Sequence, residues 1–161
     1  AREMPADVRK RCEFWLIGDT GQSSFSAKIV DLAADMKEVV LCGRKTRREM
    51  EALLCRIDAV VVPSMEETLS LAAVEAMMNK KAVICSHGGS VGAAKFIRKG
   101  MAGLLIPPGD VSALTGAMTW MENHREEADR MGNRGRLVYE KYFSLSSFEM
   151  RVGKIVEEAI N

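Results

Sequence analysis

The sequence has almost no excess of charge of either sign. Its 161 residues carry 23 Lys and Arg against 22 Asp and Glu, so the formal net charge is +1. Proteins that bind nucleic acid through many phosphate contacts usually present a strongly basic face. The balance of charge therefore argues against nucleic acid as a partner.

Long hydrophobic runs are also missing. No apolar stretch approaches the roughly 20 residues that a membrane-spanning helix requires. The opening residues AREMPADVRKRC do not have the pattern of a secretory signal peptide. We therefore expect a cytoplasmic protein without a transmembrane segment. The sequence leaves open a peripheral association of the full-length protein with a membrane.

Cysteine and histidine are scarce and dispersed. The four cysteines form no C-x-x-C pair, so zinc binding and dithiol chemistry have no support. Cys42 and Cys85 each end an apolar run, where cysteine usually serves as a small buried hydrophobe. With only His87 and His124, a multi-histidine metal site has no basis. Unpaired cysteines fit a reducing compartment.

The remaining pattern is that of one α/β domain over residues 1–161. Short apolar runs alternate with amphipathic helical stripes. Because the runs are apolar along their whole length, we expect a parallel sheet buried on both faces, in a Rossmann-like doubly wound fold with C-terminal helices. The expected strands are 14–18, 38–42, 59–62, 81–86 and 104–107. The expected helices are 25–36, 46–56, 69–79, 92–98, one capped by Asp110, 124–131, 133–142 and 146–160.

Ligands of open α/β sheets bind beyond the carboxyl ends of the strands. Here these ends carry GDTG at 18–21, GRK at 43–45, PS at 63–64 and HGG at 87–89. Glycine in such loops either allows close approach to a ligand or simply ends the strand. None of the loops matches the dinucleotide or P-loop glycine patterns, so neither of those sites has support.

Two acids flank the start of the helix expected at 69–79. Glu67 lies in the preceding loop, and Glu75 lies about two turns inside the helix. A helix N-terminus suits a phosphate, and a carboxylate further along can accept hydrogen bonds from sugar or ribose hydroxyls. Glu75 stands in the least polar stretch of the chain, so we expect it to need a partner or a ligand. For Glu67, a solvated loop acid is the alternative.

With their surroundings, these residues resemble the donor-binding C-terminal domain of retaining GT-B glycosyltransferases, the "glycosyl transferases group 1" family. That family reads as a strand, Pro-Ser, Glu-x7-Glu running into Glu-Ala-Met, a second strand and a Gly-Gly turn. This chain supplies AVVVPS, Glu67 and Glu75, EAM, AVICS and the glycine pair at 88–89. The segments GLLIPPGD at 103–110, MGNRGR at 131–136 and YFS at 142–144 also match. The resemblance runs from about residue 13 to the end.

The resemblance implies a nucleotide-sugar site. Glu75 would bind the ribose hydroxyls, and Glu67 would be the catalytic residue that contacts the transferred sugar. The amides of 69–71 would face the diphosphate, and the loop at 43–44 would lie near the base. The implied donor-binding residues besides Glu75 are Thr68, Leu69, Ser70, Leu71, Asp19, Gly21, Gly43 and Arg44.

The implied activity is transfer of a sugar, with retention, from a nucleoside diphosphate sugar to an unknown acceptor. Helix amides and basic residues would stabilise the departing diphosphate, so no metal or other cofactor is expected. A separate N-terminal domain, absent here, would bind the acceptor. We therefore expect a hexosyltransferase-type enzyme in the full-length protein and an isolated chain without activity.

The chain departs from the family pattern in several places. The family usually has Gly at the positions of Ser70 and Lys80, Pro at that of Ala82, and an acid soon after Gly-Gly. Only thirteen residues precede the first expected strand, so we expect the family's opening strand-helix unit, with its diphosphate-binding Arg and Lys, to be absent. That strand would lie between 14–18 and 59–62. We expect these two strands to pair directly. There are two alternatives: a segment of another chain fills the open position, which would give an oligomer, or the strand order differs from that of the family.

Two other functions fit an α/β domain. A sugar-nucleotide epimerase would share the two-domain plan but lacks the Glu-x7-Glu pattern. A non-catalytic module such as a phospho-receiver would need a phosphate-accepting Asp after the third strand, which ends here in Pro63 and Ser64.

Overall fold

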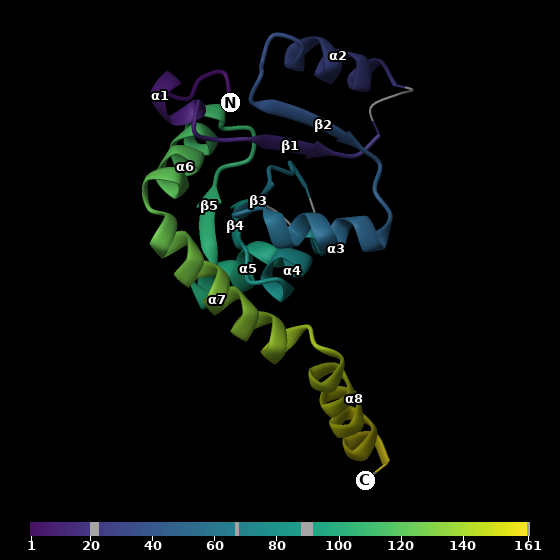
Figure 1. Ribbon diagram of the computed structural model, residues 1–161. Coiled ribbons are helices and arrows are strands. Elements are labelled where there is room, and N and C mark those ends of the chain that lie inside the picture. Colours follow the sequence, from purple (N-terminus) through teal and green to yellow (C-terminus); the bar gives the residue numbers. More distant parts are fainter. Residues whose placement is uncertain (20–22, 67, 88–91, 161) are drawn as a thin grey trace.

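The computed structural model describes residues 1–19, 23–66, 68–87 and 92–160. Parallel strands and helices alternate along the chain, as predicted (Figure 1). The strands are β1 Phe14–Ile17, β2 Val39–Gly43, β3 Ala59–Val62, β4 Ala82–Ser86 and β5 Gly103–Ile106. The helices are α1 Ala6–Arg9, α2 Ser24–Ala33, α3 Arg47–Arg56, α4 Leu71–Met78, α5 Gly92–Gly100, α6 Val111–Asn123, α7 Arg125–Tyr142 and α8 Leu145–Ile160.

The strands form two parallel sheets, β1-β2 and β3-β4-β5. The expected direct pairing of β1 with β3 is therefore wrong. Taken together, the strands of the two sheets match the doubly wound strand order 3-2-1-4-5-6. Strands β2 and β1 correspond to its strands 3 and 2, and β3, β4 and β5 correspond to its strands 4, 5 and 6. No described strand corresponds to its strand 1. In that order β1 and β3 are two strand spacings of about 4.8 Å apart, too far for backbone hydrogen bonds between them. Arg56, the last residue of α3, lies against β1, with its guanidinium 5.2 Å from the ring centre of Trp15.

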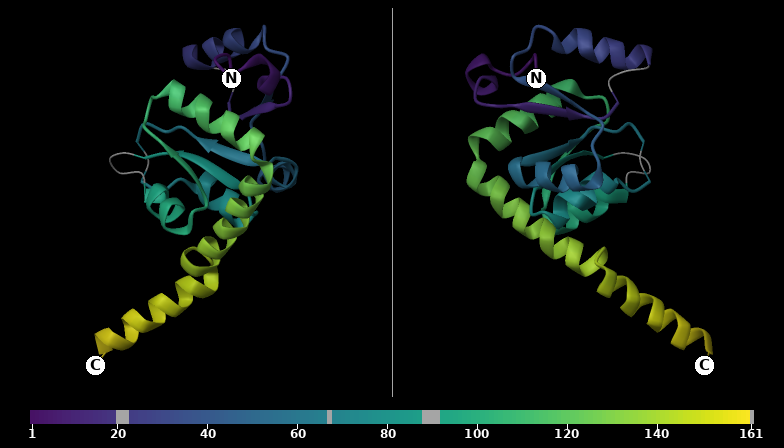
Figure 2. Two further views of the ribbon diagram at one scale, coloured as in Figure 1. Left: turned by 90° about the vertical axis from the view of Figure 1, so that its left-hand side faces the viewer. Right: turned by 45° about the vertical axis from the view of Figure 1, so that its right-hand side comes forward.

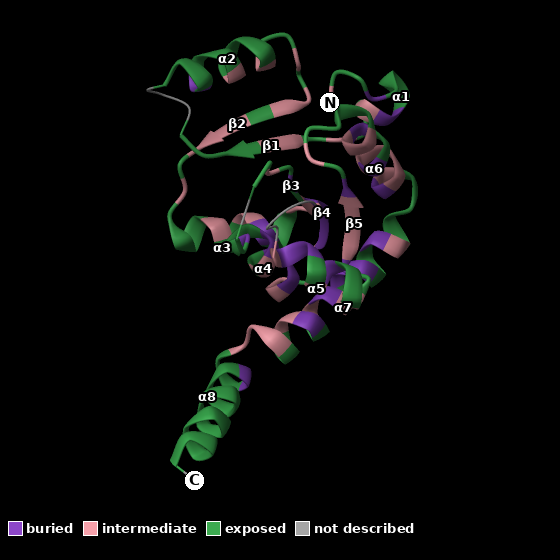
Figure 3. Ribbon diagram, turned by 180° about the vertical axis from the view of Figure 1, so that it is seen from behind, coloured by how far each residue is buried: buried purple, intermediate pink, exposed green. Residues whose placement is uncertain are grey.

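The core lies on both faces of β4, whose five residues are all buried. Val83 and Cys85 point to the cluster formed with α4, α5 and α7, whereas Ala82 and Ile84 point to the cluster formed with α6 and the start of α7. This alternation is what a strand covered on both faces requires. Figure 3 shows the buried residues concentrated in this half of the molecule.

The sheet of β1 and β2 is less covered than the sequence predicted. Leu16 is 42% exposed and Val40 is 40% exposed. Among the helices, α2 packs on β2, but its Phe25, expected on the inward stripe, is 70% exposed. Burial on both faces is therefore confirmed for β4 and wrong for β1 and β2, because the helices that cover β4 pack on the other sheet.

Residues 125–142 form one helix, α7, where the sequence predicted two. Gly132 and Gly135 do not break it, because both are needed for close packing. A Cβ at Gly132 would overlap the Lys80 carbonyl oxygen, and one at Gly135 would lie 3.2 Å from Cγ of Met77. Beyond α7, helix α8 projects away from the body (Figure 2).

Cys85 fits the predicted role of a small buried hydrophobe, whereas Cys55 is exposed. Cys85 is buried, Cys42 is half-buried, and none of the four forms a disulfide. Within the described ranges, no helix has the length and apolar character to cross a bilayer.

Candidate functional site

The loops after β1 and β2 are joined at the carboxyl edge of their sheet. The amide of Gly18 donates to the carbonyl of Gly43 over 3.1 Å, and Gly43 has φ of +66°, a conformation that favours glycine. The Asp19 carbonyl accepts from Oγ of Ser26 over 3.2 Å. Asp19 and Arg44 are both exposed at this edge. The predicted residue Gly21 lies outside the described residues.

Helix α4 is the next element after β3 and begins at Leu71. Ser70 is its N-cap, with its Oγ accepting from the Ala73 amide over 3.3 Å. Ser70 is only 3% exposed, so its side chain is turned into the protein. Its hydroxyl nevertheless occupies the Ala73 amide, one of the first-turn donors of α4.

The segment ahead of α4 presents free backbone donors. The amides of Leu69, Ser70 and Leu71 donate to no partner within the described parts of the chain. Thr68 is exposed, and the Leu71 side chain is 70% exposed. A helix N-terminus with unpaired amides suits an anion through these donors and through the positive end of the helix dipole.

Glu75 is exposed on the outward face of α4. The sequence predicted that Glu75 needs a partner or a ligand, and the described residues supply no partner. Its neighbours Ala76 and Met77 are fully buried, but the turn of the helix points Glu75 away from them. Among the described residues, no hydrogen bond or ion pair engages its carboxylate. The carboxylate is thus free to accept hydrogen bonds from a ligand.

Glu67 lies outside the described residues, so its predicted catalytic position stays a prediction. The structure adds one residue that the sequence did not single out. Ser86 ends β4 with no exposed surface, and its hydroxyl has no hydrogen-bond partner in the described chain. Its only signal in the sequence is a polar residue closing the apolar run AVICS.

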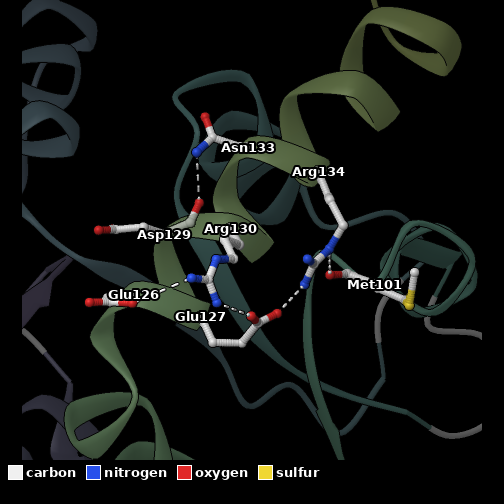
Figure 4. A network of polar contacts seen from close by, with 7 residues as sticks. All are labelled: Met101, Glu126, Glu127, Asp129, Arg130, Asn133 and Arg134. Carbon is white, nitrogen blue, oxygen red and sulfur yellow. Dashed lines mark hydrogen bonds and ion pairs between the residues drawn. The ribbon is translucent and has the colours of Figure 1, made fainter.

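A polar network on α7 has a structural role (Figure 4). Arg134 donates to the Met101 carbonyl over 2.9 Å and to the Glu127 carboxylate over 2.7 Å. Arg130 also pairs with Glu127 over 3.2 Å. Hydrogen bonds from Arg134 and then from Arg130 hold the pKa of Glu127 below its usual range. The network ties α7 to the turn before β5.

Metal ligands do not gather anywhere in the described chain: no three of its His, Cys, Asp and Glu residues come together in a metal-binding arrangement. Metal independence stays a prediction.

Parallel strands, helices on both faces of β4 and an open helix N-terminus at the strand ends define an α/β domain of the GT-B glycosyltransferase type. Residues 1–124 match the family described as "Glycosyl transferases group 1". The chain belongs to that family.

Three curated proteins illustrate the similarity. An uncharacterised glycosyltransferase of Methanocaldococcus jannaschii is 29% identical over 145 residues, covering 90% of this chain and 40% of that protein. The MMP alpha-(1->4)-mannosyltransferase of Mycolicibacterium hassiacum is 30% identical over 112 residues, covering 70% and 27%. The D-rhamnosyltransferase WbpZ of Pseudomonas aeruginosa is 30% identical over 114 residues, covering 70% and 30%. The chain thus spans less than half of the length of each.

Solved structures show the same fold. A glycosyltransferase from Rickettsia africae has a TM-score of 0.80 at 18% identity, covering 93% of this chain and 40% of that one. HepE from Anabaena, in complex with UDP, has a TM-score of 0.79 at 17% identity, covering 94% and 43%. Sucrose-phosphate synthase from Thermosynechococcus elongatus has a TM-score of 0.77 at 24% identity, covering 91% and 38%.

Proposed function

We propose that this chain is the donor-binding part of a retaining glycosyltransferase that takes its sugar from a nucleoside diphosphate sugar. The observation that carries the proposal is the pairing of two features on α4. Among the described residues, the amides of Leu69 and Leu71 at its N-terminus donate to no partner, and the exposed carboxylate of Glu75 on the same helix has none. The first suits a diphosphate and the second suits ribose hydroxyls.

The expected chemistry is electrostatic. When the bond between sugar and diphosphate breaks, negative charge develops on the departing oxygens, and amides already aimed at that position stabilise it without reorganising. The proposed roles of Arg44 near the base and of Glu67 against the transferred sugar rest on the family resemblance. The curated relatives are glycosyltransferases by name, which favours this function over an epimerase or a regulatory module.

The whole protein is proposed to be a hexosyltransferase-type enzyme with a second, acceptor-binding part. The chain spans 40%, 27% and 30% of three relatives, which leaves room for such a part in proteins of their size. On this proposal the 161-residue chain alone transfers no sugar. A cytoplasmic location likewise stays a prediction.

No described strand pairs with the edge of β1 that faces away from β2 or with the edge of β3 that faces away from β4. The amide of Phe14 donates to the carbonyl of Glu38, just before β2. Because backbone groups of successive residues in a strand point to opposite sides, the amide and carbonyl of Trp15 point away from β2. We propose that a strand outside this chain pairs with these edges, supplied by the same protein or by an oligomer. A sedimentation experiment at increasing protein concentration separates the two sources, since a monomer at all concentrations contradicts the oligomer.

The experiment that tests the donor function is calorimetric titration of the purified chain with UDP, GDP and ADP. Uridine, guanosine and adenosine are the controls, because they lack the diphosphate that the α4 amides would bind. We expect one diphosphate to bind and its nucleoside to bind far more weakly. Absence of binding by all three diphosphates, or equal binding of diphosphate and nucleoside, contradicts the proposal.

A further inference from the structure

A backbone hydrogen bond fastens helix α5 to the loop in front of α4. The amide of Gly92, the first residue of α5, donates to the Thr68 carbonyl over 3.1 Å. Two residues further along, Ser70 is held by its own hydrogen bond with the Ala73 amide. The segment 68–70 is therefore fixed at both ends, by α5 on one side and by α4 on the other.

Only glycine fits at residue 92. A Cβ built there would overlap the Thr68 carbonyl oxygen, and it would also lie 3.4 Å from the Thr68 carbonyl carbon and 3.9 Å from Cα of Leu69. All three are backbone atoms, so no side-chain rotation relieves the overlap. Any side chain at this position must move the backbone of one of the two elements.

The element that moves is the loop. The next residues of α5 are embedded in the core: Ala93 and Ile97 are 0% exposed. Ser70 is equally fixed, at 3% exposed, whereas Thr68 and Leu69 are exposed. Because well-packed cores resist displacement, an added methyl group at residue 92 would displace Thr68 and Leu69.

We propose that Gly92 is a positioning residue for donor binding: its amide and its missing side chain set the backbone of 68–69, and with it the amides that face the diphosphate. This inference rests on the proposed function. It assigns to Gly92 a role that acts through the Thr68 backbone, by a contact between the segment after β3 and the first residue of the helix after β4.

The test compares two alanine variants that place a Cβ against a backbone carbonyl. Gly92→Ala does so at the carboxyl ends of the strands. Gly132→Ala does so at the opposite end, where its Cβ would overlap the Lys80 carbonyl oxygen ahead of β4. Gly116→Ala, with nothing within 4 Å of its Cβ, controls for the general effect of alanine in a helix, which is stabilising.

Each variant is titrated with the nucleoside diphosphate that binds the wild-type chain best, and its melting temperature is recorded. We expect Gly92→Ala to raise the dissociation constant about tenfold, the equivalent of one charge-assisted hydrogen bond. Gly132→Ala should lower the melting temperature without changing affinity by more than about twofold. Wild-type affinity in folded Gly92→Ala overturns the inference, and so does an equal loss of affinity in Gly132→Ala.

A second measurement on the wild-type chain covers the case in which Gly92→Ala does not fold. Hydrogen exchange of the Gly92 amide, followed by NMR, should slow when the diphosphate is added, because the ligand steadies the Thr68 carbonyl that this amide binds. Binding that leaves the Gly92 exchange rate unchanged overturns the positioning role. Failure of the wild-type chain to bind any diphosphate contradicts instead the proposed function.

Discussion

Replacing Ser70 with glycine should weaken the fold slightly while strengthening diphosphate binding. In the native chain the Ser70 hydroxyl occupies the Ala73 amide, one of the first-turn donors of α4. Removing the hydroxyl leaves that donor to the ligand. The same change restores the glycine that is usual in the family at this position.

The structure sets the size of both effects. The capping bond is long, 3.3 Å against 2.8 Å for the Asp110 cap of α6, so its loss should cost only a few tenths of a kcal/mol, as is usual for a change from Ser to Gly at an N-cap. A new hydrogen bond to a charged phosphate contributes roughly 1.5 kcal/mol. After the added backbone freedom of glycine is discounted, we expect an affinity gain of about fivefold.

The assay is calorimetric titration with the best-binding diphosphate, together with urea denaturation of each variant. Asp110→Gly is the matched control, because it removes an N-cap of the same kind on α6. It should lower stability and leave affinity unchanged. If folded Ser70→Gly binds no better than the wild-type chain, the Ala73 amide is not part of an anion site and the reasoning about α4 fails.

Three further predictions concern stability. Lys80 adopts φ of +58° in the turn after α4, where a side chain costs roughly 1–2 kcal/mol. Lys80→Gly should therefore raise the free energy of unfolding by about 0.5–1 kcal/mol after the entropy of glycine is subtracted. Lys80→Ala keeps the strain, so an equal gain in stability of that variant, measured by thermal denaturation, would contradict the backbone explanation. Ser86→Ala removes a buried hydroxyl without a partner and should stabilise the free chain by about 1 kcal/mol in urea denaturation; a loss of similar size would show that the hydroxyl is satisfied in solution. The pKa of Glu127 is depressed, so its contribution to stability is fully present above the ordinary pKa of glutamate and is lost as pH falls through the depressed value. The wild-type chain should accordingly be more stable than Glu127→Gln at neutral pH, and urea midpoints that differ by the same amount at acid pH would argue against this linkage.

Local patterns in the sequence predicted the elements well. The strand at 59–62 coincides with β3, and Asp110 caps α6 as expected, with its carboxylate accepting from Ala113 over 2.8 Å. These features depend on a few neighbouring residues, whose apolar character or hydrogen-bonding side chain determines the local backbone. The family resemblance rested on the same kind of local motif and is confirmed.

Features that depend on distant contacts were not predictable in this way. Glycine has a low helix propensity, so Gly132 favours a break in the helix. Its close packing against the Lys80 backbone, far away in the sequence, instead places it within the continuous helix α7. Glu75 stands among apolar residues in the sequence, yet the helix period places it on the exposed face. The placement of β1 and β3 in different sheets is a long-range feature that no short motif reports.

The most direct test of the donor-binding account compares nucleotide affinity in Glu75→Gln and Glu149→Gln. Both changes remove one exposed carboxylate, but Glu149 lies on the projecting helix α8. With the diphosphate that the wild-type chain binds best, Glu75→Gln should lose about tenfold or more in affinity, because hydrogen bonds from ribose to a charged group contribute roughly 1.5–3 kcal/mol. Glu149→Gln should bind the diphosphate with the affinity of the wild-type chain. Unchanged affinity in Glu75→Gln, with its fold intact by circular dichroism, would contradict the account.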